Sequence, residues 1–170
     1  MGFDIRTVSG GEAGRALPKD FPPMTTAPGY LYAWRDLGLF TAINHVLAMC
    51  ARALEWREAS PTAGVIDSQS VKTTEFGGPR GYDAGEKIKG RKRHILTDTL
   101  GMMLFVIVHA ADIQDRDGAP DLLKAVRHRF PWLRHVIADG GFGGEKLCMA
   151  LKSQGGWTLE IIKRSGAAKG

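Results

Sequence analysis

The sequence has few cysteines and no long apolar run, and both absences narrow the class of protein. Its only two cysteines, Cys50 and Cys148, are far apart and lack CxxC spacing, so they suggest neither a disulfide framework nor a zinc site. No apolar run approaches the ~20 residues that span a membrane. The N-terminus also lacks the basic-then-apolar order of a signal peptide. We therefore expect a reduced, cytoplasmic protein with no membrane partner.

The first part of the chain has no net charge, and charge is distributed unevenly along the whole sequence. Residues 1–60 carry six basic and six acidic side chains, whereas residues 61–170 carry 17 basic and 12 acidic. The net charge of +5 therefore comes from the second part. A basic balance favours a polyanionic partner, because cations near phosphates release counterions. A charge of this size is also common in proteins that bind no nucleic acid.

Composition divides the chain into three regions. Residues 1–29 are rich in glycine and proline, which predicts an irregular arm with at most a short helix at 11–17. Residues 30–60 have apolar side chains at helical spacing, and Gly38 is expected to divide two helices. This helical region either contacts phosphates or covers an edge of the next domain. We expect the boundary at residues 60–62, with the main domain over 61–170.

Two apolar segments of that domain each end in an acid. Val65 and Ile66 precede Asp67, and Val136 to Ala138 precede Asp139, 72 residues later. Buried strands that end in this way deliver carboxylates to the rim of a sheet. A pair of carboxylates suits Mg²⁺ or Mn²⁺, which predicts a metal-dependent phosphoryl-transfer site on nucleic acid. The alternative is that each Asp is a turn residue that closes its strand.

A glycine-rich segment between these strands, residues 73–90, runs into a basic cluster. The segment shows no period and is expected to be a long loop. The basic cluster runs from Lys87 to His94, and it is interpreted either as a phosphate-binding surface or as a solvated face. His94 alone is interpreted as a packed strand residue or a phosphate donor in preference to a general base.

The remaining elements complete a mixed sheet with flanking helices. Residues 92–97 and 101–110 predict a hairpin, and 134–139 and 158–163 predict two further strands. The acid-rich segment 112–118 resembles a calcium loop only weakly, because it has no Glu near position 12. It is interpreted as a helix-capping loop with Asp117 as the cap and Pro120 in the first turn. Helices are expected up to Phe130 and over 145–154, and the tail 164–170 is expected to be irregular.

Five segments together resemble a bacterial insertion-sequence DDE transposase of the insertion-sequence-five-related group. They are VIDSQSVKTT at 65–74, GPRGYDAG at 78–85, KGRKRH at 89–94, AADIQDRDGA at 110–119 and ADGGFGG at 138–144. The resemblance is close over residues 61–169 and looser over 15–58. It implies an α/β, ribonuclease-H-like mixed sheet with flanking helices, preceded by a small helical N-terminal region.

The resemblance also implies the site, its metal and its partners. Asp67 and Asp139 would be the first two catalytic acids and would hold Mg²⁺ or Mn²⁺ for DNA strand cleavage and transfer. Transposon ends and target DNA would be the partners, with several copies of the chain assembled on paired ends in the bacterial cytoplasm, at the nucleoid. The expected DNA-binding residues are Lys72, Lys87, Lys89, Arg91, Lys92, Arg93 and His94.

One departure from the family separates two functional hypotheses. The family's third acid is a Glu on a helix downstream of the segment that here is 163–170, so the sequence resembles a C-terminally truncated transposase. Neither Glu145 nor Glu160 lies in the third motif. We expect metal affinity and strand cleavage to be impaired by this truncation. The alternative function is a non-catalytic, DNA-binding transposase remnant or regulator.

Overall fold

The computed structural model describes residues 26–73 and 79–162. The expected short helix at 11–17 and the tail at 164–170 lie outside these residues. Helix α2 covers Thr26–Asp36 and α3 covers Leu39–Leu54, with Gly38 between them at a φ of 69°. The chain turns there because glycine adopts positive φ without a steric penalty. Helix α2 begins four residues earlier than expected, because its first turn accepts Pro28.

Neither of these helices is long and apolar enough to cross a membrane alone, and the same is true of every other helix in the described ranges. Residues Pro28–Asp36 and Leu39–Leu54 pass a test of length and composition only as a pair, and the pair is bent by 71° at its break.

The chain divides into two compact units, and the division falls inside α3, between Asn44 and His45. The sequence placed a boundary later, at residues 60–62. Contacts of α3 explain the difference. Arg52 donates to Asp98 at 2.5 Å and to the Glu58 carbonyl at 2.8 Å, and His45 packs on the ring of Phe130. The second half of α3 is therefore anchored in the larger unit.

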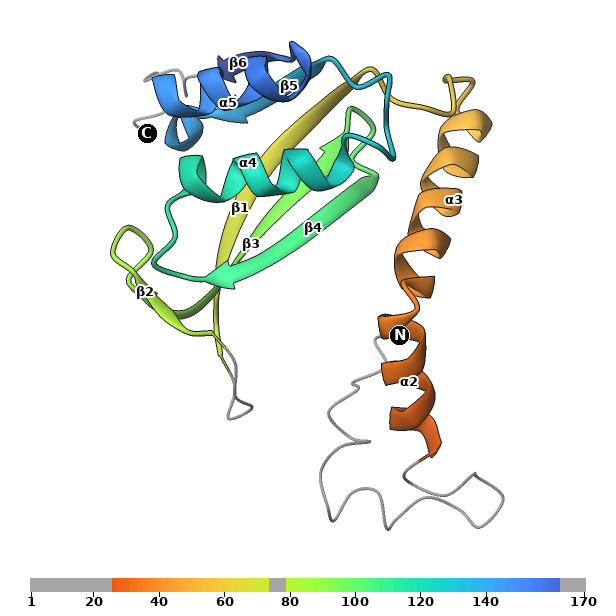
Figure 1. Ribbon diagram of the computed structural model, residues 1–170, viewed down its shortest axis with the longest axis horizontal. Coiled ribbons are helices and arrows are strands. Elements are labelled where there is room, and N and C mark those ends of the chain that lie inside the picture. The colour runs from red at the N-terminus through yellow and green to blue at the C-terminus, as the bar shows by residue number, and fades with distance from the viewer. Residues whose placement is uncertain (1–25, 74–78, 163–170) are drawn as a thin grey trace, which may run out of the picture. The chain divides into compact units, whose positions relative to one another are not determined.

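The larger unit is built on one six-stranded mixed sheet (Figure 1). Its strand order is β2-β3-β1-β5-β6, and β4 also pairs with β3. Strands β1, β3 and β4 pair antiparallel, whereas β1, β5 and β6 pair parallel. This is the ribonuclease-H-like arrangement that the resemblance implied. The strands are β1 Ala63–Lys72, β2 Gly81–Asp83, β3 Ile88–Asp98, β4 Met103–Ala110, β5 His135–Asp139 and β6 Thr158–Ile162.

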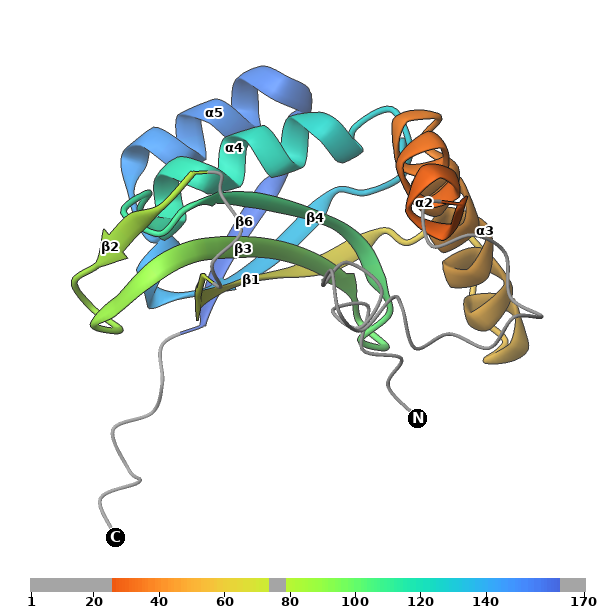
Figure 2. The ribbon, with the colours of Figure 1, turned by 90° about the horizontal axis from the view of Figure 1, so that it is seen from below.

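Two helices, α4 at Asp115–Val126 and α5 at Glu145–Gly155, lie on one face of this sheet (Figure 2). Their apolar side chains pack against alternate residues of the strands, including Ile66, Leu96 and Ala138, which are all at most 2% exposed. Side chains at the intervening positions of each strand point to the opposite face. We call the first the covered face and the second the open face.

Two parts of the sequence-based secondary structure need correction. The predicted loop at 73–90 contains β2, which pairs with residues 88–90 of β3. Asp83 turns the chain between them, because its Oδ1 accepts from the backbone N–H of Gly85 and Glu86. Helix α4 begins at Asp115 and has Gln114 as its N-cap, so Asp117 is inside the first turn and Pro120 lies inside the helix beyond it. The expected hairpin, α5 and β6 are confirmed.

Candidate active site

Strand pairing brings the two predicted acids together. The parallel pair of β1 and β5 aligns Ile66 with Ala138, and the next position on each strand is Asp67 and Asp139. Neighbouring strands lie about 4.8 Å apart, so the two acids are adjacent at the carboxyl ends of parallel strands. Because Ile66 and Ala138 point into the core, Asp67 and Asp139 both point to the open face. Both side chains are exposed.

Each acid has one oxygen engaged locally. Oδ1 of Asp67 accepts from the Ser68 N–H at 2.8 Å, and Oδ1 of Asp139 accepts from the Gly141 N–H at 2.9 Å. The second bond makes Asp139 the cap of the short 3₁₀ helix η2, Gly140–Phe142. Asp139 therefore also acts as a turn residue, as the alternative interpretation predicted. It does not exclude a ligand role, because Oδ2 of each acid makes no hydrogen bond within the described residues.

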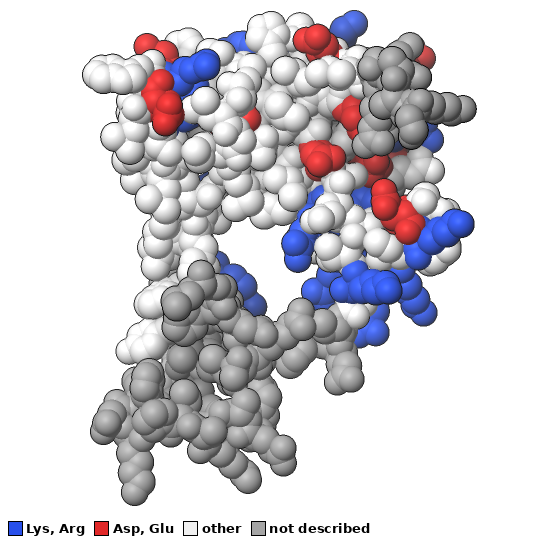
Figure 3. All heavy atoms as spheres, turned by 180° about the vertical axis from the view of Figure 1, so that it is seen from behind, with Lys and Arg blue, Asp and Glu red and all other residues white. Residues whose placement is uncertain are grey.

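The open face combines acids with cations. Arg93 lies opposite Gln69 on β1, two pairs along from Asp67, and Arg91 lies opposite Val71. Both arginines alternate with buried neighbours and so share the face of the acids. The view from behind the helices shows acidic side chains gathered close to a larger basic group near the β2 end of the sheet (Figure 3). Exposed Lys72, Lys87 and Lys89 belong to the same end.

The strand period divides the predicted DNA-binding set. Lys92 and His94 alternate with Arg91 and Arg93, so they point to the covered face, where they are 7% and 0% exposed. Burial of this degree leaves no room for a DNA phosphate beside either side chain. For His94, the structure agrees with the packed-residue interpretation. Five cations of the predicted set remain accessible: Lys72, Lys87, Lys89, Arg91 and Arg93.

Lys92 is instead the centre of a buried ionic network. Its Nζ lies 2.9 Å from Oδ2 of Asp83 on β2 and 2.8 Å from Oδ1 of Asp115 on α4. Ser70 on β1 donates to the same Oδ2 of Asp83 at 2.6 Å. This bond is the main cause of a lowered Asp83 pKa, with burial opposing it and Lys92 adding to it. Burial alone would lower the Lys92 pKa, but the bonds to Asp115 and Asp83 outweigh it and raise that pKa.

The network reaches the loop that carries Asp139. A Cβ atom added to Gly141 would lie 2.9 Å from Oδ2 of Asp115 and 3.2 Å from Oδ1 of Asp139. One oxygen of Asp115 thus lies beside the Gly141 backbone, whose N–H donates to Asp139. The other oxygen of Asp115 is bound by Lys92. Sequence reasoning missed Ser70, Asp83 and Asp115 as site residues. The Asp-x-Gly turn at Asp83 was a usable signal for its local role, but its contact with Lys92 depends on long-range pairing.

His94 has a different environment from its basic neighbours in the chain. Neither ring nitrogen makes a hydrogen bond of normal geometry within the described residues. The ring packs edge-on against His109, with centroids 5.1 Å apart, and against Phe142. Burial, with a smaller contribution from His109, lowers the pKa of His94 from 6.5 to about 4. The imidazole is therefore neutral at pH 7.

The chemistry of the acids fits a divalent cation held by few protein ligands. Two carboxylates at neighbouring positions on adjacent strands repel one another, and a cation between them removes that repulsion. Within the described residues both have an oxygen without a hydrogen-bond partner, and oxygen is the donor atom that Mg²⁺ and Mn²⁺ prefer. Within residues 26–73 and 79–162, however, no group of three His, Cys, Asp or Glu side chains is placed to hold one ion.

A family model described as the transposase DDE domain matches residues 58–170. The match covers most of the chain, and it includes both strands that carry the adjacent acids. The chain therefore belongs to the transposase DDE domain family. A search of curated proteins finds no match.

Two solved structures are similar at low identity. A chain of the simian T-cell lymphotropic virus intasome in complex with the PP2A regulatory subunit B56 gamma is 12% identical with a TM-score of 0.43. The alignment covers 63% of this chain and 33% of that one. The Mos1 transposase paired-end complex with the left transposon end is 7% identical with a TM-score of 0.39, covering 75% and 42%. The chain thus spans less than half the length of either.

Proposed function

We propose that this domain binds DNA and cuts its phosphodiester backbone during transposition, with Asp67 and Asp139 as the first two catalytic acids. The observation that carries the proposal is the register of β1 and β5, which places these two acids side by side on the open face. Membership of the transposase DDE domain family supports the reaction class.

In this proposal the acids hold Mg²⁺ or Mn²⁺, and each remaining group has a separate task. The bound ions would activate water or a 3′-hydroxyl and stabilise the leaving oxygen of an in-line displacement. Arg91 and Arg93 on the open face, with Lys72, Lys87 and Lys89 near β2, hold the DNA backbone, which positions the strand without reading its sequence. The Lys92 network holds Asp115 against the loop that follows Asp139, and this contact keeps the Asp139 carboxylate oriented.

Two features of the wider assembly belong to the same proposal. Asp67 and Asp139 fall on the motifs of the family's first two catalytic acids, and in this proposal they hold the divalent ions together. We also expect several copies to assemble on paired DNA ends, as the resemblance implies. A bacterial insertion sequence related to the insertion-sequence-five group is the proposed source.

Cleavage and binding assays separate an enzyme from a non-catalytic DNA-binding protein. Supercoiled plasmid is incubated with the chain and Mg²⁺ or Mn²⁺, and nicked product is measured beside Asp67→Asn, Asp139→Asn and the control Asp121→Asn on exposed α4 surface. Nicking that the first two substitutions abolish and the control retains supports the proposal. Salt-sensitive DNA binding without nicking would favour the remnant or regulator.

Calorimetric titration with Mn²⁺ tests the site without requiring turnover. Binding that both Asp67→Asn and Asp139→Asn remove places the two acids in one site. A folded wild-type chain that binds no Mn²⁺ would contradict the metal site and leave DNA binding as the function to pursue.

A further inference from the structure

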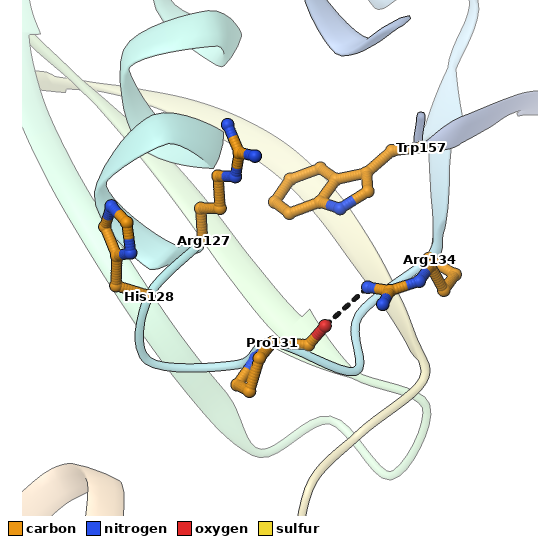
Figure 4. Close-up of a pocket in the computed structure, with 5 residues that line it drawn as sticks. All are labelled: Arg127, His128, Pro131, Arg134 and Trp157. Atoms are coloured by element: carbon orange, nitrogen blue, oxygen red, sulfur yellow. Dashed lines mark hydrogen bonds between the residues drawn. The ribbon is translucent and has the colours of Figure 1, made fainter. Parts of the chain in front are cut away.

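A pocket lies at the end of the sheet away from the acids (Figure 4). It has a volume of about 330 Å³ and is lined by Arg127, His128, Pro131, Arg134 and Trp157. Arg127 is the C-cap of α4, Arg134 directly precedes β5, and Trp157 directly precedes β6. The pocket is therefore at the amino end of β5, whereas Asp139 is at its carboxyl end, about 13 Å along the strand.

The lining is cationic and includes no acid. Arg127 and Arg134 are permanently charged. The surrounding sequence has the same bias, because no Asp or Glu occurs between Asp121 and Asp139. That interval contains Lys124, Arg127, Arg129 and Arg134. Like charges gathered in this way are stabilised by an anion between them.

Both arginines of the pocket have N–H groups available to bind a ligand, but within the described residues only Arg134 is also hydrogen-bonded to the protein. Arg134 is oriented by the protein, because its Nη1 donates to the carbonyls of Pro131 and Leu133. Its Nε and Nη2 groups make no hydrogen bond in the described part of the chain. Arg127 has neither a hydrogen bond nor an ion pair there. A guanidinium carries five N–H donors, so the pair can present several donors to one anion.

The wall opposite Arg127 is apolar and fixed. Trp157 is only 5% exposed and belongs to the core cluster, so core packing fixes the orientation of its indole ring. Figure 4 shows the Trp157 ring along one edge of the group, with Arg127 near one end of it and Arg134 near the other. A rigid wall beside two guanidinium groups favours a compact ligand. A phosphate group has this size and matches guanidinium geometry through paired N–H···O bonds.

We propose that the pocket formed by Arg127, His128, Arg134 and Trp157 binds a backbone phosphate of DNA, as a second contact separate from the acids. The inference rests on the proposed function in that DNA is the partner. It adds an anchor that takes no part in bond breaking. An anchor at this distance would set how a strand lies across the sheet, because phosphate contacts fix register and orientation.

Salt dependence of DNA binding tests the anchor with a matched control. Binding of a fluorescently labelled duplex is measured by anisotropy over a series of salt concentrations for wild type, Arg127→Ala and Lys152→Ala. Lys152 is exposed in the last turn of α5 and loses the same charge outside the pocket. We expect Arg127→Ala to bind several-fold more weakly at low salt. Its slope of log affinity against log salt should fall by about 0.9, the value for one lost phosphate contact.

Equal affinities and slopes for Arg127→Ala and Lys152→Ala would overturn the proposal. A second readout identifies the ligand, namely the NMR signal of the Trp157 indole N–H, assigned with Trp157→Phe. We expect it to shift on addition of the duplex and to stay unmoved in Arg127→Ala. A shift with inorganic phosphate alone, without a loss of DNA affinity in Arg127→Ala, would show an anion site that DNA does not use and would also overturn the proposal.

The same experiments distinguish this inference from the proposed function. Binding is measured without divalent ions and in the Asp67→Asn background, so it does not depend on cleavage. Normal nicking with an unaltered salt slope in Arg127→Ala rejects the anchor alone. An Arg127-dependent slope without nicking rejects the enzyme and keeps the anchor, and absence of any DNA binding rejects both.

Discussion

Lys92 and Asp115 lie 23 positions apart in sequence, yet their side chains form a salt bridge of 2.8 Å on the covered face of the sheet. The lysine comes from the middle of a strand in a run of cations, and the aspartate begins a helix. Asp83 completes the arrangement at 2.9 Å. Two carboxylates and one ammonium leave this network with one net negative charge, close to the loop of Asp139.

Removal of Lys92 should therefore destabilise the fold. Lys92→Met leaves Asp83 and Asp115 as like charges with little water to solvate them. We expect the free energy of unfolding, measured with urea at pH 7, to fall by about 3–5 kcal/mol. Lys89→Met, an exposed position on the same strand, should change it by less than about 0.5 kcal/mol.

A double variant keeps this prediction testable if the single variant fails to fold. Lys92→Met with Asp115→Asn removes one of the two uncompensated charges and should recover part of the lost stability. Equal stabilities of Lys92→Met and Lys89→Met would show that the network is not formed in solution.

The glycine beside Asp139 gives a prediction about the site rather than the fold. In Gly141→Ala the new Cβ meets both Asp115, which Lys92 holds, and Asp139. We expect Asp139 to be displaced, so that Mn²⁺ affinity and nicking each fall about 10-fold or more, as for other supporting residues of metal sites. Calorimetry and the plasmid assay measure these two quantities.

Gly140→Ala is the matched control, because a Cβ at Gly140 meets nothing within 4 Å. It should leave Mn²⁺ affinity, nicking and the melting temperature unchanged. If the two substitutions lower Mn²⁺ affinity equally, the contact between Asp115 and Gly141 has no part in orienting Asp139.

Much of this site could be predicted from local pattern, and the remainder depended on contacts between distant segments. Asp67 and Asp139 were recognisable because apolar strands that end in an acid are a local signal. The period of two along β3 would also have separated Arg91 and Arg93 from Lys92 and His94. Instead the six basic residues from Lys87 to His94 were interpreted together as one surface.

The burial of Lys92 was beyond sequence reasoning for a physical reason. A buried ammonium is stable only with partners, and here they come from β2 and α4. Strand β2 was itself missed, because a three-residue strand in a glycine-rich segment has no period to detect. The division of contacts within α3 likewise depends on a long-range contact, the buried pair of Arg52 and Asp98.

Close packing of α4 on β3 yields another prediction. Gly118 is buried in α4, and a Cβ added to it would lie 2.3 Å from Cε1 of His94. Alanine normally stabilises a helix by about 1 kcal/mol relative to glycine. Here we expect Gly118→Ala to destabilise the protein by roughly 1–3 kcal/mol, because the ring must move within a packed core. Thermal or urea unfolding measures the change.

The His94→Ala background should reverse the sign of that effect, since the space beside Gly118 is then open. The resulting double-mutant cycle isolates the contact between the helix and the ring. Additive effects of the two substitutions would contradict the close approach of Gly118 to His94.

The buried imidazole of His94 predicts how stability depends on pH. Its pKa is about 4 in the folded protein and 6.5 when unperturbed, so the unfolded chain binds the proton first as pH falls. Neutral His94 therefore contributes stability that is fully present above pH 6.5 and is lost progressively as pH falls through 6.5 toward 4. Between pH 7.5 and pH 5 we expect a loss of about 2 kcal/mol from this residue.

Urea unfolding at the two pH values, for wild type and His94→Leu, measures that contribution. The leucine variant cannot take up the proton, so its unfolding free energy should vary less with pH by the same amount, whatever its stability at pH 7.5. His128→Gln serves as the control, because it removes an exposed imidazole outside the ring contacts of His94 and retains His94 itself. Since Lys92 opposes protonation of His94 and Asp115 favours it, the comparison is made with both left intact. An identical pH dependence in wild type and His94→Leu would show that the ring is not buried in its neutral form.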